Sequence, residues 1–203
     1  MRFCLLMLAA AVLVPCAGAE SDENTYDNPG IGISVTKPAD WHFGTVEDHR
    51  DNLRRMTYRD EEMGEYVREE STAPLVYMMK YPEPYDDLNP TFKVGIRPLG
   101  TIPNDQPTAV LTVLLAGFRR TLNELTVQAG PKDTTIDGLP AGYLRIHYDL
   151  VTTDSAVCSA CSEVWIVPRD SCLLMIGAGT KQDDADSARE EIATILGSLR
   201  IKK

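Results

Sequence analysis

The stretch Gly138-Leu-Pro-Ala-Gly-Tyr-Leu-Arg-Ile-His-Tyr-Asp-Leu-Val151 decides the fold of this chain. Its first five residues are typical of a tight turn, because glycine and proline supply the backbone angles that turns require. From Tyr143 onward apolar and polar side chains alternate, and one face consists of Leu144, Ile146, Tyr148 and Leu150. A period of two predicts a β-strand with one face more apolar than the other.

Two further strand-like runs follow, from Glu163 to Val167 and from Cys172 to Ala178. The link between them, Pro168-Arg-Asp-Ser171, has the length and the chemistry of a hairpin connection. Both runs are apolar at almost every position, which predicts that they lie in the middle of a sheet with both faces covered. We therefore expect Trp165 and Leu174 in the core of a central meander, on which the other elements pack.

Two amphipathic helices are expected, from Asp105 to Leu125 and from about Asp184 to Leu199, because apolar side chains recur there at helical spacing. Gly130-Pro131 is expected to break the chain before a short strand at Thr134-Thr-Ile-Asp137. A charged, helix-prone insert at about residues 44–72 is interpreted as a salt-bridged outer face. Earlier strands are expected at Ile31 to Thr36, Leu75 to Tyr81 and Thr91 to Arg97.

This order of elements predicts an α+β fold. Links of hairpin length dominate the second half of the chain, so the sheet should be largely antiparallel, with helices packed on it. The 203 residues suit a single domain. The formal net charge is -10, and the basic doublets are confined to Arg54-Arg55 and Arg119-Arg120. That balance argues against nucleic-acid binding, which needs a basic face.

Residues 1–19 are interpreted as a secretory signal peptide. Arg2 supplies the positive start, Cys4 to Val14 is an apolar run too short to span a bilayer, and Ala17-Gly-Ala19 fits a cleavage site. Residues 20–29 then form a flexible tether. These features predict export to the periplasm or the exterior, and no later segment has the length and apolarity of a transmembrane helix.

A lipid anchor is the alternative to soluble export. Leu13-Val-Pro-Cys16 loosely matches the lipobox of bacterial lipoproteins, in which Cys16 would carry the lipid. The lipobox has a small residue directly before the cysteine, and this chain has Pro15 there, which fits the pattern poorly. We therefore prefer soluble export.

Two motifs resemble the PsbP-like group, which includes DcrB-like exported bacterial proteins of uncharacterised function. The motifs are Gly32-Ile-Ser-Val-Thr-Lys-Pro-Ala-Asp-Trp41 and Thr135-Ile-Asp-Gly-Leu-Pro-Ala-Gly-Tyr143. The resemblance implies an α/β/α sandwich with a six- to seven-stranded, largely antiparallel sheet in one domain over residues 30–203. It also implies a binding or assembly role, and it transfers no catalytic residue.

The pair Cys158-Ser-Ala-Cys161 is the sharpest candidate for chemistry. In an exported protein such a pair is expected to form a disulfide or loop clasp, with a thiol-redox centre as the alternative. The thioredoxin-type arrangement needs a helix directly after the first cysteine, and the pair stands between strands. Cys172 leaves an odd number of thiols in the mature chain, so a bridge from Cys158 or Cys161 to Cys172 stays open.

The proline-rich loop after residue 80 is the candidate partner surface. It carries two aromatic and three acidic side chains: Tyr81, Glu83, Tyr85, Asp86 and Asp87. Tyrosine is common in contact patches. Oxygen ligands from such a loop could bind Ca²⁺, but the acidic spacing matches no EF-hand, and a rigid surface loop is the preferred interpretation. The three histidines do not cluster in the sequence, so no metal site is expected.

The sequence therefore predicts a non-enzymatic cell-envelope protein that binds another envelope protein or a small ligand. It contains no Gly-x-Ser-x-Gly, no glycine-rich phosphate loop and no His-Glu-x-x-His. No cofactor is expected. The alternative is a thiol-redox or metal-binding envelope protein that uses Cys158 and Cys161.

Overall fold

The computed structural model describes residues 23–62, 64–65, 73–98, 106–169, 172–184 and 187–202. The helices with described bounds are α1 (Val46–Arg54), α3 (Pro107–Thr121) and α4 (Ala188–Ser198), and residues 61–62 and 64–65 are helical as well. No helix in these ranges is long and apolar enough to cross a membrane.

The main sheet has eight strands, and every pairing in it is antiparallel. Its order is β3 (His42–Phe43), β5 (Val76–Met79), β6 (Thr91–Pro98), β10 (Cys172–Lys181), β9 (Val157–Arg169), β8 (Leu139–Thr152) and β4 (Met56–Thr57), and β7 (Asn123–Ile136) also pairs with β8. A separate sheet has the order β1 (Thr25–Asn28), β2 (Ile33–Thr36) and β11 (Arg200–Ile201).

The predicted meander is confirmed. Tyr143 lies opposite Trp165 in the β8–β9 ladder, and Leu174 lies opposite Val167 in the β9–β10 ladder. Trp165 is 7% exposed and Leu174 is fully buried. The sheet exceeds the expected six to seven strands because β3 and β4 have only two residues each, too few for a visible alternation.

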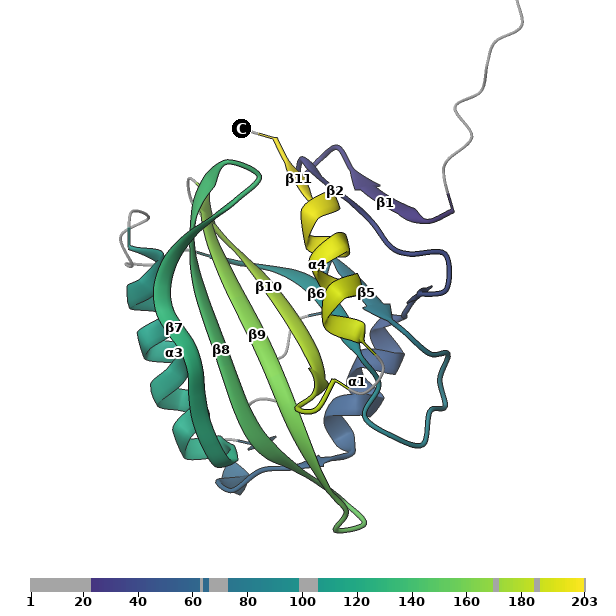
Figure 1. The fold of residues 1–203 in the computed structure, drawn as a ribbon, viewed down its shortest axis with the longest axis vertical. Helices are drawn as coiled ribbons and strands as arrows, with labels where there is room; N and C mark the ends of the chain where they lie inside the picture. The colour runs from purple at the N-terminus through teal and green to yellow at the C-terminus, as the bar shows by residue number, and fades with distance from the viewer. Residues whose placement is uncertain are drawn as a thin grey trace, which may run out of the picture.

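Helices cover both faces of the main sheet, which makes the predicted α/β/α sandwich (Figure 1). On one face α4 and the small sheet pack on Trp165, Val167, Leu174 and Ile176. On the other face α3 packs on Leu144, Ile146, Ile166 and Leu173. Helix α1 lies on the α3 side, where its His49 ring stands 5.3 Å from the Tyr77 ring of β5.

The predicted helix over residues 105–125 is wrong at its C-terminal end. Helix α3 ends at Thr121, and the chain runs directly into β7. The predicted break at Gly130-Pro131 is also wrong, because this cis dipeptide lies inside β7 and the β7–β8 ladder absorbs it through register shifts. Gly130 has φ of +82°, and a Cβ there would stand 2.2 Å from the carbonyl oxygen of Tyr143, so only glycine fits.

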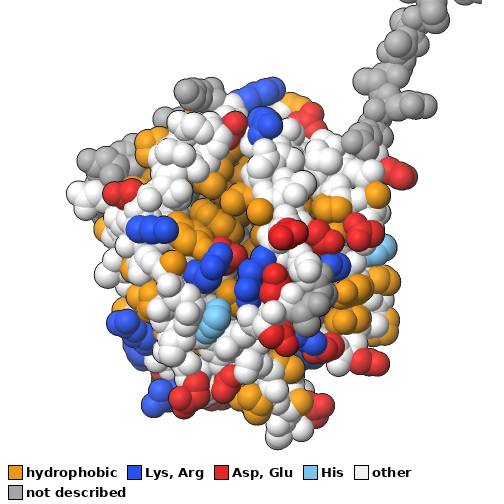
Figure 2. Space-filling view, viewed as in Figure 1, with side chains coloured by type: hydrophobic (Ala, Val, Ile, Leu, Met, Phe, Trp, Pro, Cys, Tyr) orange, Lys and Arg blue, Asp and Glu red, His pale blue; other side chains and the backbone are white. Residues whose placement is uncertain are grey.

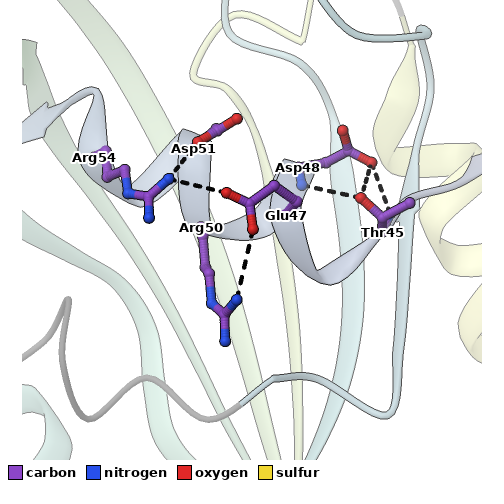
Figure 3. Close-up of polar contacts among 6 residues, drawn as sticks. All are labelled: Thr45, Glu47, Asp48, Arg50, Asp51 and Arg54. Atoms are coloured by element: carbon purple, nitrogen blue, oxygen red, sulfur yellow. Dashed lines mark hydrogen bonds and ion pairs between the residues drawn. The ribbon is translucent and has the colours of Figure 1, made fainter.

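The charged insert is helical from Val46 to Arg54, and residues 63 and 66–72 lie outside the described residues. Thr45 caps α1 through a capping box: Asp48 N donates to Thr45 Oγ1 at 3.1 Å, and Thr45 N donates to Asp48 Oδ2 at 2.7 Å (Figure 3). Arg54 pairs with Glu47 at 3.0 Å and with Asp51 at 2.8 Å on the exposed side. The interpretation as a salt-bridged outer face holds for this helix.

The expected tether at residues 20–29 needs a correction, because Thr25–Asn28 form β1 and pair with β2. The alternation that begins at Ile33 places Ile33 and Val35 in the core, and β11 pairs with β2 on its other side. Trp41 is fully buried beneath α4, where its Nε1 donates to Glu191 Oε2 at 2.9 Å.

Candidate ligand-binding cavity

A cavity of about 830 Å³ lies between the main sheet and helices α1 and α3. Its floor is the α3-side face of β6, β10, β9 and β8. Three of the floor positions are glycines: Gly95 on β6, and Gly177 and Gly179 on β10. A Cβ added at Gly95 would meet nothing closer than a backbone oxygen at 4.0 Å, so the missing side chains leave room above the sheet.

The walls of the cavity are largely apolar. Leu53 of α1 and the face formed by Leu114, Phe118 and Leu122 at α3 border the space, and Met175 stands on the floor between them. These side chains are half-buried, and Leu114, Phe118, Leu122 and Met175 continue the apolar core beneath α3. A volume of this size and an apolar lining are typical of small-molecule sites.

Polar groups occupy a few defined places in this lining. Tyr77 of β5 accepts a hydrogen bond at its hydroxyl from Asn52 Nδ2 at 2.9 Å, and burial raises the pKa of Tyr77 to about 12. Burial, with a contribution from the charge on Lys93, lowers the pKa of His49 to about 4, so this imidazole is neutral at physiological pH. The hydroxyl groups of Tyr148 and Ser162 lie 3.1 Å apart on the floor.

Two basic side chains stand on the floor among the apolar groups. Lys93 and Arg97 lie four residues apart on β6, on the side opposite the buried Phe92 and Val94. Burial lowers the pKa of Lys93, and the nearby charge on Arg97 lowers it further. A lysine whose pKa falls for these reasons lacks a compensating anion.

The predicted partner loop forms part of the cavity rim. Glu83, Tyr85, Asp86 and Asp87 border the cavity, and Tyr81 stacks on Tyr85 with ring centroids 4.6 Å apart. The structure therefore brings these candidates together, although at the rim of a cavity that the sequence did not predict.

Two acidic groups of this rim, Glu83 and Asp87, are held by the protein itself. Glu83 accepts hydrogen bonds from Tyr85 N at 2.9 Å and Asn89 Nδ2 at 3.1 Å, and it pairs with Arg55 at 3.6 Å. Asp87 binds Lys181 from β10. Within the described part of the chain no group of three His, Cys, Asp or Glu side chains could hold a metal ion.

The expected disulfide clasp does not form: Cys158, Cys161 and Cys172 are free thiols. Cys158 and Cys161 lie three residues apart on the same strand, so their side chains leave opposite faces of the sheet. Cys158 borders the cavity on the α3 side, and Cys161 lies on the α4 side.

A bridge to Cys172 is excluded as well. Cys161 lies opposite Thr180, and Cys172 lies opposite Arg169 at the far end of the β9–β10 ladder. At about 3.3 Å per residue, Cys172 lies far beyond the roughly 7 Å that a disulfide can span between Cα atoms.

A polar network lies on the α4 face of the main sheet, opposite the cavity. Arg145 Nη2 donates to Glu163 Oε2 at 3.0 Å, and the hydroxyl of Tyr143 donates to the same oxygen. Burial and the Glu163 carboxylate raise the pKa of Tyr143. Figure 2 shows basic side chains over the strands beside α4, next to apolar ones. Each member has a partner across the strands, which indicates a stabilising ladder.

Sequence reasoning missed Lys93, Arg97 and the glycine floor. The signal was present in Thr91 to Arg97, where Lys93, Gly95 and Arg97 alternate with apolar residues. That pattern also fits a solvent-facing strand, because alternation gives the face of a residue but not what covers it.

No protein-family model matches the chain, and no curated protein matches it. Solved structures do match. LpqN, described as involved in cell envelope biogenesis of Mycobacterium tuberculosis, is 15% identical with a TM-score of 0.53, and the match covers 84% of this chain and 83% of LpqN. The PsbP protein of the cyanobacterium Synechocystis is 13% identical with a TM-score of 0.51, and the match covers 94% of this chain and 99% of that protein.

At these identities the likeness is one of fold. The chain has the PsbP-like fold that its two motifs resemble, with the mostly antiparallel sheet and helices on both faces. Function must then be argued from the site.

Proposed function

We propose that the protein is an exported cell-envelope binding module that holds a small, largely apolar ligand in the cavity between α1, α3 and the main sheet. The observation that carries this proposal is the cavity of about 830 Å³, with its glycine floor and its apolar walls. The signal-peptide pattern of residues 1–19 and the fold shared with a protein of cell envelope biogenesis support the location.

Closed packing is the normal condition of a protein interior, and voids that exceed a few water molecules are rare. Here the half-buried Leu114 and Phe118 face the open space across Gly95 and Gly177 instead of meeting side chains from the sheet. This exposed apolar surface favours an apolar ligand, because burying it contributes about 25 cal/mol per Å² to the free energy of binding.

The test is a binding assay with the hydrophobic fluorophore Nile red. The protein should bind the dye with a blue-shifted emission, and Gly95→Leu should weaken binding about tenfold or more because its side chain fills the cavity. The matched control is Gly117→Leu, since Gly117 lies on α3 outside the lining and has open space around it. Equal dye binding by the protein and by Gly95→Leu would contradict the proposal.

A further inference from the structure

Lys93 lies across the glycine floor of the cavity. The β-ladders place it opposite Tyr77 on β5 and opposite Gly177 on β10. A Cβ added at Gly177 would stand 3.3 Å from Cε of Lys93, so the lysine stem occupies the space that a side chain at this glycine would need. The missing side chain at Gly177 therefore lets the ammonium group extend over β10.

The ammonium group of Lys93 has no hydrogen bond or ion pair among the described residues, and neither does the guanidinium group of Arg97. Other half-buried lysines of the protein are paired: Lys80 with Glu191 at 2.8 Å, and Lys181 with Asp87. Among these side chains, the cations without a described partner are those on the cavity floor.

None of the described acids that line the cavity forms an ion pair with Lys93 or Arg97. Glu83 is held by Arg55, and Asp87 is held by Lys181. Glu163 lies on β9, which β10 separates from β6, and it turns to the α4 face, where Arg145 binds it. The floor thus presents two positive charges to a space with apolar walls.

An unpaired charge in an apolar site is costly, and the cost falls when an opposite charge binds next to it. The environment of Lys93 shows this cost in its lowered pKa, whose largest cause is burial. A ligand that brings its own anion would offset it and would add charge-assisted hydrogen bonds, which are about twice as strong as neutral ones.

We propose that the ligand of this cavity is a single-chain amphiphile with a carboxylate head, which Lys93 binds together with Arg97 while the hydrocarbon chain lies along Leu114 and Phe118. This inference rests on the proposed function and narrows it to one ligand class. Lys93 and Arg97 are four residues apart on one face of β6, a separation of about 13 Å along the strand. A carboxylate that both side chains bind would lie above Gly95, which stands between them and brings no side chain of its own.

The probes are dodecanoate and dodecanol, which share the chain and differ in the charge of the head. Each competes with Nile red on the purified protein at neutral pH. Dodecanoate should displace the dye at a concentration about tenfold or more below that of dodecanol, because its charged head forms charge-assisted hydrogen bonds that the alcohol cannot form. Equal displacement by the two probes would overturn the carboxylate inference and leave the proposed apolar site intact.

Substitutions at Lys93 test the residue itself. Lys93→Met keeps the apolar stem and should abolish the preference for dodecanoate, whereas Lys93→Arg keeps the charge and should retain it. The matched control is Lys132→Met, because Lys132 lies over the Tyr143 ring on the α4 face, 5.3 Å from its centroid, and should not alter the preference. A Lys93→Met protein that still prefers dodecanoate would overturn the assignment.

Folding of the variants has its own readout. Lys93→Met removes an unpaired charge, so its melting temperature without ligand should equal or exceed that of the unsubstituted protein. Dodecanoate should then raise the melting temperature of the unsubstituted protein and of Lys93→Arg more than that of Lys93→Met. If neither probe displaces Nile red and neither shifts the melting temperature, the proposed function fails along with the inference.

Discussion

Asn52 of α1 donates a hydrogen bond from Nδ2 to the hydroxyl oxygen of Tyr77 on β5 at 2.9 Å, and this bond joins the helix to the sheet beside the cavity. The Tyr77 ring also lies against the buried His49 of the same helix. The position of α1 over the floor therefore depends on one side chain of β5.

Tyr77→Phe should destabilise the protein by about 1 kcal/mol, because it leaves the half-buried amide of Asn52 without its acceptor. Asn52→Ala removes the other partner, and the double variant should be less destabilised than the sum of the single ones. Urea unfolding of the four proteins measures the coupling. Strict additivity would show that the bond does not hold α1.

His49 should make the fold sensitive to acid. Its pKa is about 4 in the folded protein against 6.5 ordinarily, so the unfolded chain takes up the proton first as the pH falls. Stability should therefore be lost between pH 6.5 and about 4, with an upper bound of about 3 kcal/mol, and His49 should contribute no further loss below that window.

The measurement is the free energy of unfolding across that pH window for the protein and for His49→Gln. The substitution should flatten the dependence, and His42→Gln, at an exposed histidine of β3, is the matched control. Carboxylates titrate in the same window in all three proteins, so the difference between the curves isolates His49. Identical slopes would show that the pKa of His49 is the same in the folded and the unfolded protein.

Gly142 on β8 is required for the approach of α3. A Cβ at this position would stand 2.8 Å from Cδ1 of Leu111 and 3.0 Å from the backbone carbon of Pro107. Gly142→Ala should therefore cost about 1–3 kcal/mol by overpacking.

Gly117→Ala in α3 is its control, because a Cβ there meets nothing within 4 Å. It should raise the stability by about 0.5–1 kcal/mol, the usual gain from replacing a helical glycine. Chemical denaturation of both variants provides the comparison, and a neutral Gly142→Ala would mean that α3 sits farther from β8.

Trp165 tests the centre of the sheet. It is 7% exposed and packs in the α4-side core against the Tyr143 ring, with centroids 5.3 Å apart. Trp165→Ala should cost about 3–5 kcal/mol by leaving a large cavity. Val113→Ala is the surface control, because Val113 on α3 is 70% exposed. A comparable loss in both variants would contradict the burial of Trp165.

The thiols should differ in reactivity with no disulfide among them. Cys161 is 2% exposed and burial raises its pKa, so iodoacetamide should label it far more slowly than Cys158. All three should react once the protein is denatured, and dithiothreitol should not change the melting temperature. An intact mass that reveals a Cys158–Cys161 bridge would require β9 to be broken between these residues.

Several elements could be predicted from the sequence because one physical pattern dominated each of them. The alternation after Gly142 and the apolar runs around Trp165 and Leu174 leave no other reading than buried strands. The end of α3 could not be predicted, since Leu122 and Leu125 fit the apolar stripe of a helix, whereas Leu122 is the cap residue and Leu125 belongs to β7, and both pack on the same core.

The cavity was beyond prediction for another reason. Each floor residue follows the alternation of its own strand. The space arises because Gly95 of β6 and Gly177 of β10 lie diagonally across the β6–β10 ladder. Which strands lie side by side depends on the strand order of the sheet, and the alternation within one strand does not give that order. The alternation of Thr91 to Arg97 assigns Lys93 to a face, and only the placement of α1 and α3 makes that face an interior.

The small sheet has a consequence for how the protein is made. Strand β2 lies between β1 and β11, and Ser198 binds the backbone of Thr36 across 162 positions of sequence. Contacts this distant give a high contact order, which slows folding. Synthesis proceeds from the N-terminus, so Ile33 and Val35 are made long before β11. Their packing in the core is complete only after β11 has been made. One edge of β2 can pair with β1 early, but its other edge must stay unpaired until the C-terminal strand β11 arrives.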